Sequence, residues 1–236
     1  MIDPGRITHI AFDADDTLWA HENVFVDAKK AATELLRPYL GEKDIEKELY
    51  RFEKKNLAIF GYGIKGFMLS LIETAIELSS GKISGGEIQR IIDLGKEMLE
   101  HPIELLTHVS EAIDLFEDHY PLLIITKGDL FDQENKIARS GIGDHFSIVE
   151  IVSEKNPKSY RKICRKHEID PRGLLMLGNS LKSDILPVLE IGGQAIHIPF
   201  EYTWHHERTE ADKSRDGLAI VESLEEAVNL VFPGVV

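Results

Sequence analysis

Residues 8–18 read Thr8-His9-Ile10-Ala11-Phe12-Asp13-Ala14-Asp15-Asp16-Thr17-Leu18. The apolar run suits a buried strand, and it stops at Asp13, where three carboxylates fall within four residues. If the chain stays extended, Asp13 and Asp15 point to the same side of the strand end, because side chains alternate along a strand. Two carboxylates so close together repel each other unless a cation or a shared proton lies between them. Mg2+, a hard ion with oxygen ligands, meets that need. The alternative is a strand followed by an Asx-rich turn or a helix cap.

The composition is that of a globular protein with a sizeable core. Of its 236 residues 43% are hydrophobic and 29% charged, and the formal net charge is −14. Because no basic stripe occurs, nucleic acid and anionic membranes are not expected as partners. The single cysteine, Cys164, excludes an internal disulfide and a metal site built on thiolates.

The location and assembly of the protein are only partly constrained by the sequence. No uncharged apolar run reaches membrane-spanning length, and the N-terminus lacks a signal-peptide pattern. We therefore expect a cytoplasmic protein. The sequence leaves the oligomeric state open.

Between about residue 22 and residue 100 the sequence has helical periodicity and no convincing strand. Ser84 and Glu87 form a plausible capping box for the last helix of this segment, and His101-Pro102 ends it. We predict four helices here, over 24–40, 42–60, 64–80 and from Ser84 to His101.

From residue 103 onward, helical and strand patterns alternate. The predicted strands are 122–126, 148–152, 174–177 and 195–198, and the predicted helices are 108–119, 132–139, 157–167, 183–191 and 224–231. This alternation is typical of an α/β fold with a doubly wound parallel sheet, which the first strand must join. We therefore expect an α/β core domain from residues 1–19 and 103–236, with residues 20–102 inserted as a helical domain.

Polar residues follow each predicted strand. Thr126-Lys127-Gly128 follows the second strand, Ser153-Glu154-Lys155 the third, and Gly178-Asn179-Ser180-Leu181-Lys182-Ser183-Asp184 the fourth. Since ligands bind at the carboxyl ends of the strands in such a sheet, we expect these residues to meet the carboxylates at 13 and 15. Carboxylates for a metal, a hydroxyl for phosphate oxygens and a lysine for the transferring group suit phosphoryl transfer.

The order of Asp13-Ala14-Asp15-Asp16-Thr17, Thr126, Lys155 and Gly178-Asn179 with Asp184 resembles the four motifs of the haloacid dehalogenase-like hydrolase superfamily. The resemblance covers essentially the whole chain. It implies a Rossmann-like core, and the inserted helices look like that superfamily's helical (C1-type) cap.

The resemblance implies a role for each matching residue. Asp13 would be the nucleophile that forms an aspartyl-phosphate, and Asp15 would be the acid and base, with its backbone carbonyl on Mg2+. Thr126 would hydrogen-bond the phosphoryl group, and Lys155 would offset its charge. Asp184, with Asn179, would complete the metal site, whose ligands would thus be Asp13, Asp15, Asn179 and Asp184. The substrate would be a small phosphorylated metabolite.

Two features depart from the family pattern. The fourth motif usually opens Gly-Asp, whereas this chain has Gly178-Asn179, so one negative charge is missing from the metal shell. Lys158 also follows Lys155 closely, and we favour Lys155 because it is nearer the strand end. Lys158 is expected on the exposed start of a helix whose first position is Pro157.

Three further places carry open alternatives. Lys127 is either a substrate contact or a solvated lysine at a turn. The glycine-rich break at 60–66 either is a plain turn or brings Tyr62 and Lys65 to the substrate. The loop 199–207 holds the adjacent residues His205 and His206, but without a third ligand we favour a rim loop around Trp204 over a metal site.

The sequence thus predicts a Mg2+-dependent phosphatase that acts on a small phosphorylated metabolite through an aspartyl-phosphate. One alternative is a 2-haloacid dehalogenase-type hydrolase, but dehalogenation needs no acid two residues after the nucleophile. Another is a non-enzymatic phospho-acceptor signalling domain, but such domains lack both that acid and a large helical insert.

Overall fold

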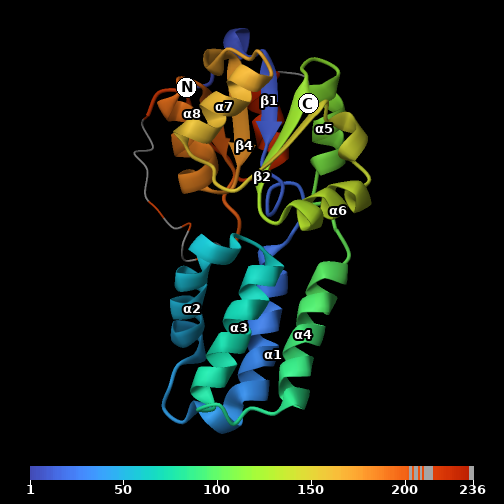
Figure 1. The fold of residues 1–236 in the computed structure, drawn as a ribbon. Coiled ribbons are helices and arrows are strands. Elements are labelled where there is room, and N and C mark those ends of the chain that lie inside the picture. The colour runs from blue at the N-terminus through green and yellow to red at the C-terminus, as the bar shows by residue number, and fades with distance from the viewer. Residues whose placement is uncertain (202–203, 205–206, 208, 210–214, 234–236) are drawn as a thin grey trace. The chain divides into compact units, whose positions relative to one another are not determined.

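The computed structural model describes residues 1–201, 204, 207, 209 and 215–233 (Figure 1). In this part of the chain, six strands form one parallel sheet in the order β3-β2-β1-β4-β5-β6. The strands are β1 His9–Phe12, β2 Leu122–Lys127, β3 Ile148–Val152, β4 Leu174–Gly178, β5 Gln194–His197 and β6 Leu218–Ile220. The predicted doubly wound α/β fold is confirmed.

Side chains of the central strands alternate between two apolar cores, one on each face of the sheet. In β1, Ile10 and Phe12 face one core and Ala11 faces the other. The first core is covered by α5 (Val109–Glu117), α6 (Leu130–Ser140) and α9 (Leu224–Val231), and the second by α7 (Pro157–Lys166) and α8 (Leu186–Glu190) (Figure 1). Burial of both faces explains why these strands are continuous apolar runs.

Four helices lie between β1 and α5, as the periodicity predicts. They are α1 Glu22–Leu40, α2 Ile45–Phe60, α3 Ile64–Leu78 and α4 Gly85–Glu100. Their apolar stripes form a core of their own, which includes Leu36, Leu49, Leu71 and Ile91. The capping box of Ser84 and Glu87 is present at the start of α4.

The chain divides into two compact units. The α/β unit comprises Met1–Glu22, Ile103–Lys127 and Gln133–Val236, and the helical unit comprises Asn23–Pro102 with Gly128–Asp132. Residues 128–132, directly after β2, thus group with the inserted helices. The predicted range of the helical domain, 20–102, does not include these five residues. No helix in the described ranges has both the length and the apolar character that a membrane crossing requires.

The structure differs from the predicted elements in two places. Strand β6 was not predicted, because it has only three residues and its pairing with β5 defines it. The predicted helix 183–191 is instead a π-helical turn, η4 (Leu181–Ile185), followed by the short helix α8. Pro187 lies in the first turn of α8, where a missing backbone N–H is tolerated, and it disfavours one continuous helix.

Candidate active site

Asp13 is the first residue after β1, and its position is fixed by the sheet. Its backbone N–H donates to the carbonyl of Leu177 in β4 at 2.9 Å, so the hydrogen bonding between β1 and β4 continues one residue beyond the end of β1. The carboxylate accepts a hydrogen bond from Lys155 Nζ, and its other oxygen accepts one from Thr17 Oγ1 at 3.3 Å. Burial, and then the nearby charge of Asp184, raises the pKa of Asp13 to about 7.

Lys155 bridges two carboxylates of the α/β unit. Its Nζ contacts Asp13 and donates to Asp184 Oδ1 at 2.7 Å, and only 2% of the side chain is exposed. Burial opposes the charge of this ammonium, but the two carboxylates outweigh burial and raise the pKa of Lys155. The residue is held just before α7, whose N-terminus is capped by Asn156.

Lys158 does not take part in this cluster. It lies in the first turn of α7 with an exposed side chain, and its backbone N–H donates to Asn156 Oδ1 at 3.0 Å. The structure therefore places Lys155 beside Asp13, as the order of the motifs suggests, and Lys158 on the surface.

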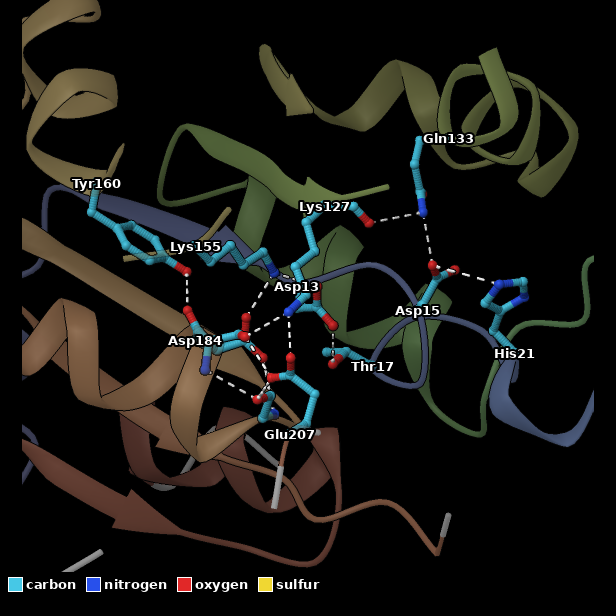
Figure 2. Close-up of polar contacts among 12 residues, drawn as sticks. Asp13, Asp15, Thr17, His21, Lys127, Gln133, Lys155, Tyr160, Asp184 and Glu207 are labelled. Atoms are coloured by element: carbon cyan, nitrogen blue, oxygen red, sulfur yellow. Dashed lines mark hydrogen bonds and ion pairs between the residues drawn. The ribbon is translucent and has the colours of Figure 1, made fainter. Parts of the chain in front are cut away.

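Asp184 is positioned by the π-helical turn after β4. Its Oδ2 accepts the backbone N–H of Ser180 at 2.9 Å, and 1% of the side chain is exposed. The close approach needs glycine at 178, because a Cβ there would lie 2.4 Å from Asp184 Oδ2. Figure 2 shows Asp13, Lys155 and Asp184 gathered in one group.

Asp15 belongs to a second group of contacts. Lys136 Nζ donates to both of its oxygens at 2.8 Å, and Trp19 Nε1 and Gln133 Nε2 each donate to one oxygen at 2.8 Å. His21 lies near the same carboxylate, as Figure 2 shows. Burial opposes ionisation, but the charges of His21 and Lys136 outweigh it and lower the pKa of Asp15.

Strand β1 ends at Phe12, and the shared direction of the two carboxylates stays a prediction. The two carboxylates contact different lysines, Asp13 with Lys155 and Asp15 with Lys136. The alternative reading of a helix cap applies to Asp16, which has φ 62° and accepts the backbone N–H groups of His21 at 2.7 Å and Glu22 at 3.0 Å at the start of α1. Asp is among the residues that tolerate this left-handed backbone.

Thr126 and Lys127 are the last two residues of β2. Thr126 is buried and lies opposite Ile151 of β3. Lys127 is not the solvated lysine that one interpretation predicted, since only 14% of its side chain is exposed. Its Nζ donates to Ser183 Oγ at 2.9 Å and to the carboxylate of Glu207.

Asn179 lies directly after β4, where the family pattern places the acid of the opening Gly-Asp of the fourth motif. Its carbonyl faces His197 Nε2 at 2.9 Å. It lines a cavity of about 350 Å³ together with Ser180, His197, Glu201, Glu207 and other residues. Among the described residues, no three His, Cys, Asp or Glu side chains are arranged to hold a metal ion. The assignment of Asn179 and Asp184 to a metal site stays a prediction.

Tyr62 and Lys65 belong to the helical unit, at the break between α2 and α3. Lys65 Nζ forms an ion pair with Asp129 Oδ1 at 2.8 Å within that unit. Their part in substrate binding stays a prediction. His205 and His206, which the sequence offers as a pair, lie outside the described residues.

Several residues of the site were missed from the sequence, above all Lys136, Gln133 and Glu207. Gln133 and Lys136 are three residues apart in the predicted helix 132–139, so they share one face of it. Lys136, on that face, lies next to the apolar residue Ile137. This neighbour is the one local signal that indicates a buried lysine, which needs an acidic partner. Glu207 is the acid of the loop 199–207, but no local signal indicates its partners, because its side-chain contacts lie 24 to 80 positions away.

Comparison with known proteins adds independent information. A family model described as haloacid dehalogenase-like hydrolase matches residues 7–192. The glyceraldehyde 3-phosphate phosphatase of Pyrococcus furiosus is 25% identical over 203 residues, which cover 83% of this chain and 82% of that protein. The protein of the same name from Pyrococcus abyssi is 33% identical over 93 residues, which cover 37% of this chain and only 39% of that protein.

A solved structure resembles the chain over nearly its whole length. It is a haloacid dehalogenase-like family hydrolase from Xanthomonas campestris, with a TM-score of 0.87 and 38% sequence identity, and the match covers 98% of this chain and 93% of that chain.

Proposed function

Because the chain belongs to the haloacid dehalogenase-like hydrolases, we propose that it is a Mg2+-dependent phosphatase that hydrolyses a small phosphorylated metabolite. The observation that carries the proposal is the bridge of Lys155 between Asp13 and Asp184, with a second carboxylate two residues after Asp13. The phosphatase names of the two Pyrococcus relatives support the reaction class.

The proposed reaction has two steps. In the first, a carboxylate oxygen of Asp13 attacks phosphorus, the bond from phosphorus to the leaving oxygen breaks, and Asp15 gives that oxygen a proton. In the second, Asp15 takes a proton from water, which attacks the phosphoryl group and releases Asp13 and phosphate. Thr126 would hold a phosphoryl oxygen, and Lys155 would offset the charge at the nucleophile.

The contact with Lys136 bears on these two steps differently. It holds Asp15 ionised, which is the state that a base needs in the second step. For the first step Asp15 must carry a proton, and the negative charge of a bound phosphoryl group nearby favours that protonation. The pH dependence of kcat, which reports groups of the enzyme–substrate complex, should therefore differ from that of kcat/KM, which reports groups of the free enzyme.

The chemistry of the residues fits a hard divalent cation. The carboxylates of Asp13 and Asp184 approach closely enough for one ammonium to bridge them, and the charge of Asp184 helps to raise the pKa of Asp13. The pair therefore carries more negative charge than Lys155 neutralises. Asp13, Asp184, Asn179 and the backbone carbonyl of Asp15 would hold Mg2+, which when bound offsets phosphoryl charge.

Asp15 argues against the dehalogenase alternative, because a departing halide needs no proton. The same residue, together with the helical unit, argues against a phospho-acceptor domain. We propose that the helical unit acts as the cap, and that Tyr62 and Lys65 contribute to substrate binding there.

The test is phosphate release from a panel of phosphorylated metabolites and from p-nitrophenyl phosphate, with Mg2+ and with EDTA. We expect Mg2+-dependent turnover that Asp13→Asn abolishes and that the surface control Asp144→Asn leaves unchanged. In Asp15→Asn, the activated p-nitrophenyl ester should leave an acid-stable, hydroxylamine-sensitive phosphoenzyme in a rapid quench. Halide release from 2-haloacids, or normal turnover by Asp13→Asn, would contradict the proposal.

A further inference from the structure

The carboxylate of Glu207 is held by three donors from the α/β unit. Lys127 Nζ donates to Oε1, and Ser180 Oγ and Ser183 Oγ donate to Oε2 at 2.7 Å and 2.5 Å. Only 11% of the Glu207 side chain is exposed. Figure 2 shows this carboxylate beside Asp184 and the end of Lys127.

The three donors come from the loops that form the candidate active site. Lys127 follows Thr126 at the end of β2, and Ser183 directly precedes Asp184. The serines are held by the core, since Ser183 N–H donates to Ser180 Oγ at 3.1 Å and the Tyr160 hydroxyl donates to the Ser183 carbonyl at 3.1 Å. The two serines are thus fixed by the core, and Lys127 Nζ reaches the same point, where it also donates to Ser183 Oγ at 2.9 Å.

The arrangement matches a carboxylate in particular. One oxygen takes the ammonium and the other takes two hydroxyl groups, so both ends of a planar carboxylate are satisfied. Burial opposes the charge of Glu207, but Lys127 and the two serines outweigh it and lower the pKa of Glu207 to about 2. The donors therefore hold an anion.

A cavity adjoins this point. Ser180 and Glu207 both line the space of about 350 Å³, which also borders Asn179 of the fourth motif. Its volume is at the lower end of the range for small-molecule pockets, so the cavity has room for one small substrate group.

We propose that Lys127, Ser180 and Ser183 form a second anion subsite, which Glu207 occupies in the absence of substrate and which a carboxylate on the leaving group of the substrate takes over. The subsite rests on the proposed function, and it narrows the substrate class to phosphate monoesters that carry a carboxylate.

The test uses ω-carboxyalkyl phosphates of increasing chain length, each compared with the alkyl phosphate of equal length. The measured quantity is the ratio of kcat/KM for the two esters, in which losses common to both cancel. We expect a ratio of about ten or more at one chain length, since a charged hydrogen bond contributes about 1.5–3 kcal/mol.

The variants separate the subsite from general charge effects. Lys127→Gln should lower the ratio about tenfold. Ser183→Ala should also lower the ratio, and it replaces the lysine variant in the test if that variant does not fold. Glu207→Gln should raise the ratio, because the neutral amide competes less for Lys127. The matched control Glu201→Gln removes the same charge from the wall of the same cavity but frees no donor, so it should raise the ratio less than Glu207→Gln does.

A ratio near one at every chain length, or equal effects of Glu207→Gln and Glu201→Gln, would overturn the inference while phosphatase activity remains. If neither ester is hydrolysed, the proposed function fails instead. In that case the subsite is tested by calorimetric binding of the corresponding carboxyalkyl and alkyl phosphonates. Equal affinities of the two phosphonates, or an equal loss of affinity for both in Lys127→Gln, would overturn the subsite.

Discussion

Asp13 and Asp15 are two residues apart, yet their surroundings move their pKa values in opposite directions. Lys155 is shared between Asp13 and Asp184, so one positive charge serves two buried carboxylates and the pKa of Asp13 rises. Lys136 contacts Asp15 and, with His21, lowers its pKa. In the protein without a bound cation, Asp13 therefore keeps its proton to higher pH than Asp15 does.

The raised pKa of Asp13 predicts the stability of Asp13→Asn. An unfolded aspartate has a pKa of about 3.9, so the folded wild type, with a pKa of about 7, holds its proton more tightly and loses stability as the pH rises between these values. Asparagine does not titrate. In EDTA, the melting temperature of Asp13→Asn should exceed that of the wild type more at pH 8 than at pH 5.

Thermal melts of both proteins at the two pH values measure this difference, with Asp144→Asn as a surface control. An equal or larger advantage at pH 5 would show that Asp13 is not destabilised by ionisation in the folded protein.

A second prediction concerns Lys136→Met, which keeps most of the volume and removes the charge beside Asp15. We expect kcat to fall by part of the roughly 10²–10⁴-fold contribution of a general acid–base residue. Stability should fall by about 3 kcal/mol, as for a broken buried ion pair. Lys136→Arg, which retains the charge, should recover part of both losses.

The acid dependence gives a separate check on Lys136. The depressed pKa of Asp15 contributes stability above about pH 3.9 that is lost as the pH falls below it. Lys136→Met should therefore lose less stability than the wild type between pH 5 and pH 3 in urea titrations. Unchanged kcat, or an acid dependence equal to that of the wild type, would remove Lys136 from the role of positioning Asp15.

Among the elements, β4 and the turn after it determine how closely Asp184 approaches the site. Gly178 ends β4, and the π-helical turn that follows brings Asp184 back over it. A second glycine, Gly173, lies just before β4, where an added Cβ would meet Thr8 Oγ1 at 2.4 Å. Thr8 is exposed, so its hydroxyl can rotate and its Cβ, at 3.2 Å, needs only a small shift, whereas Asp184 is buried and its Cβ and Cγ both lie 2.6 Å from the added atom.

Gly178→Ala should therefore abolish most of the activity, because its Cβ displaces the Asp184 carboxylate from Lys155. Gly173→Ala is the matched control at the other end of the same strand, and it should keep kcat near the wild-type value. Phosphate release and circular dichroism of both variants measure the outcome. Equal activity of the two variants would mean that the position of Asp184 is not critical.

In the whole molecule, the helical unit has an apolar core separate from the two cores of the sheet. That core is drawn from residues between Val24 and Met98, all of which belong to the helical unit. Substitutions in the helical unit can therefore change that unit without rebuilding the reactive group. This separation suits a division in which one unit performs chemistry and the other discriminates between substrates.

Tyr62→Ala and Lys65→Ala should lower kcat/KM for the preferred metabolite more than for p-nitrophenyl phosphate. We expect a difference of about 1–3 kcal/mol, the range for one lost polar contact with its unpaired partner. Stability should change by no more than about 1 kcal/mol, since the Lys65–Asp129 pair is partly exposed. Lys54→Ala, at an exposed position of α2, is the control, and equal losses on both substrates would show that the break is only a turn.

The sequence by itself determined the fold class, because most elements are encoded locally. The exceptions are β6, which its pairing with β5 defines, and the π-helical turn after β4. Buried parallel strands such as Leu122–Lys127 are continuous apolar runs, and helices such as α4 have their own periodicity and cap. The same local order indicated Asp13, Thr126, Lys155 and Asp184, since strand ends of a parallel sheet meet at one edge.

Only the tertiary structure decided how those residues are paired. Lys136 reaches Asp15 across 121 positions, and Glu207 reaches Lys127 across 80. A lysine or glutamate on a polar stretch gives no sign of its partner, because the free energy of such a pair depends on burial and distance after folding. The sequence therefore determined which groups are present at the edge of the sheet, and packing determined the charge that each of them carries.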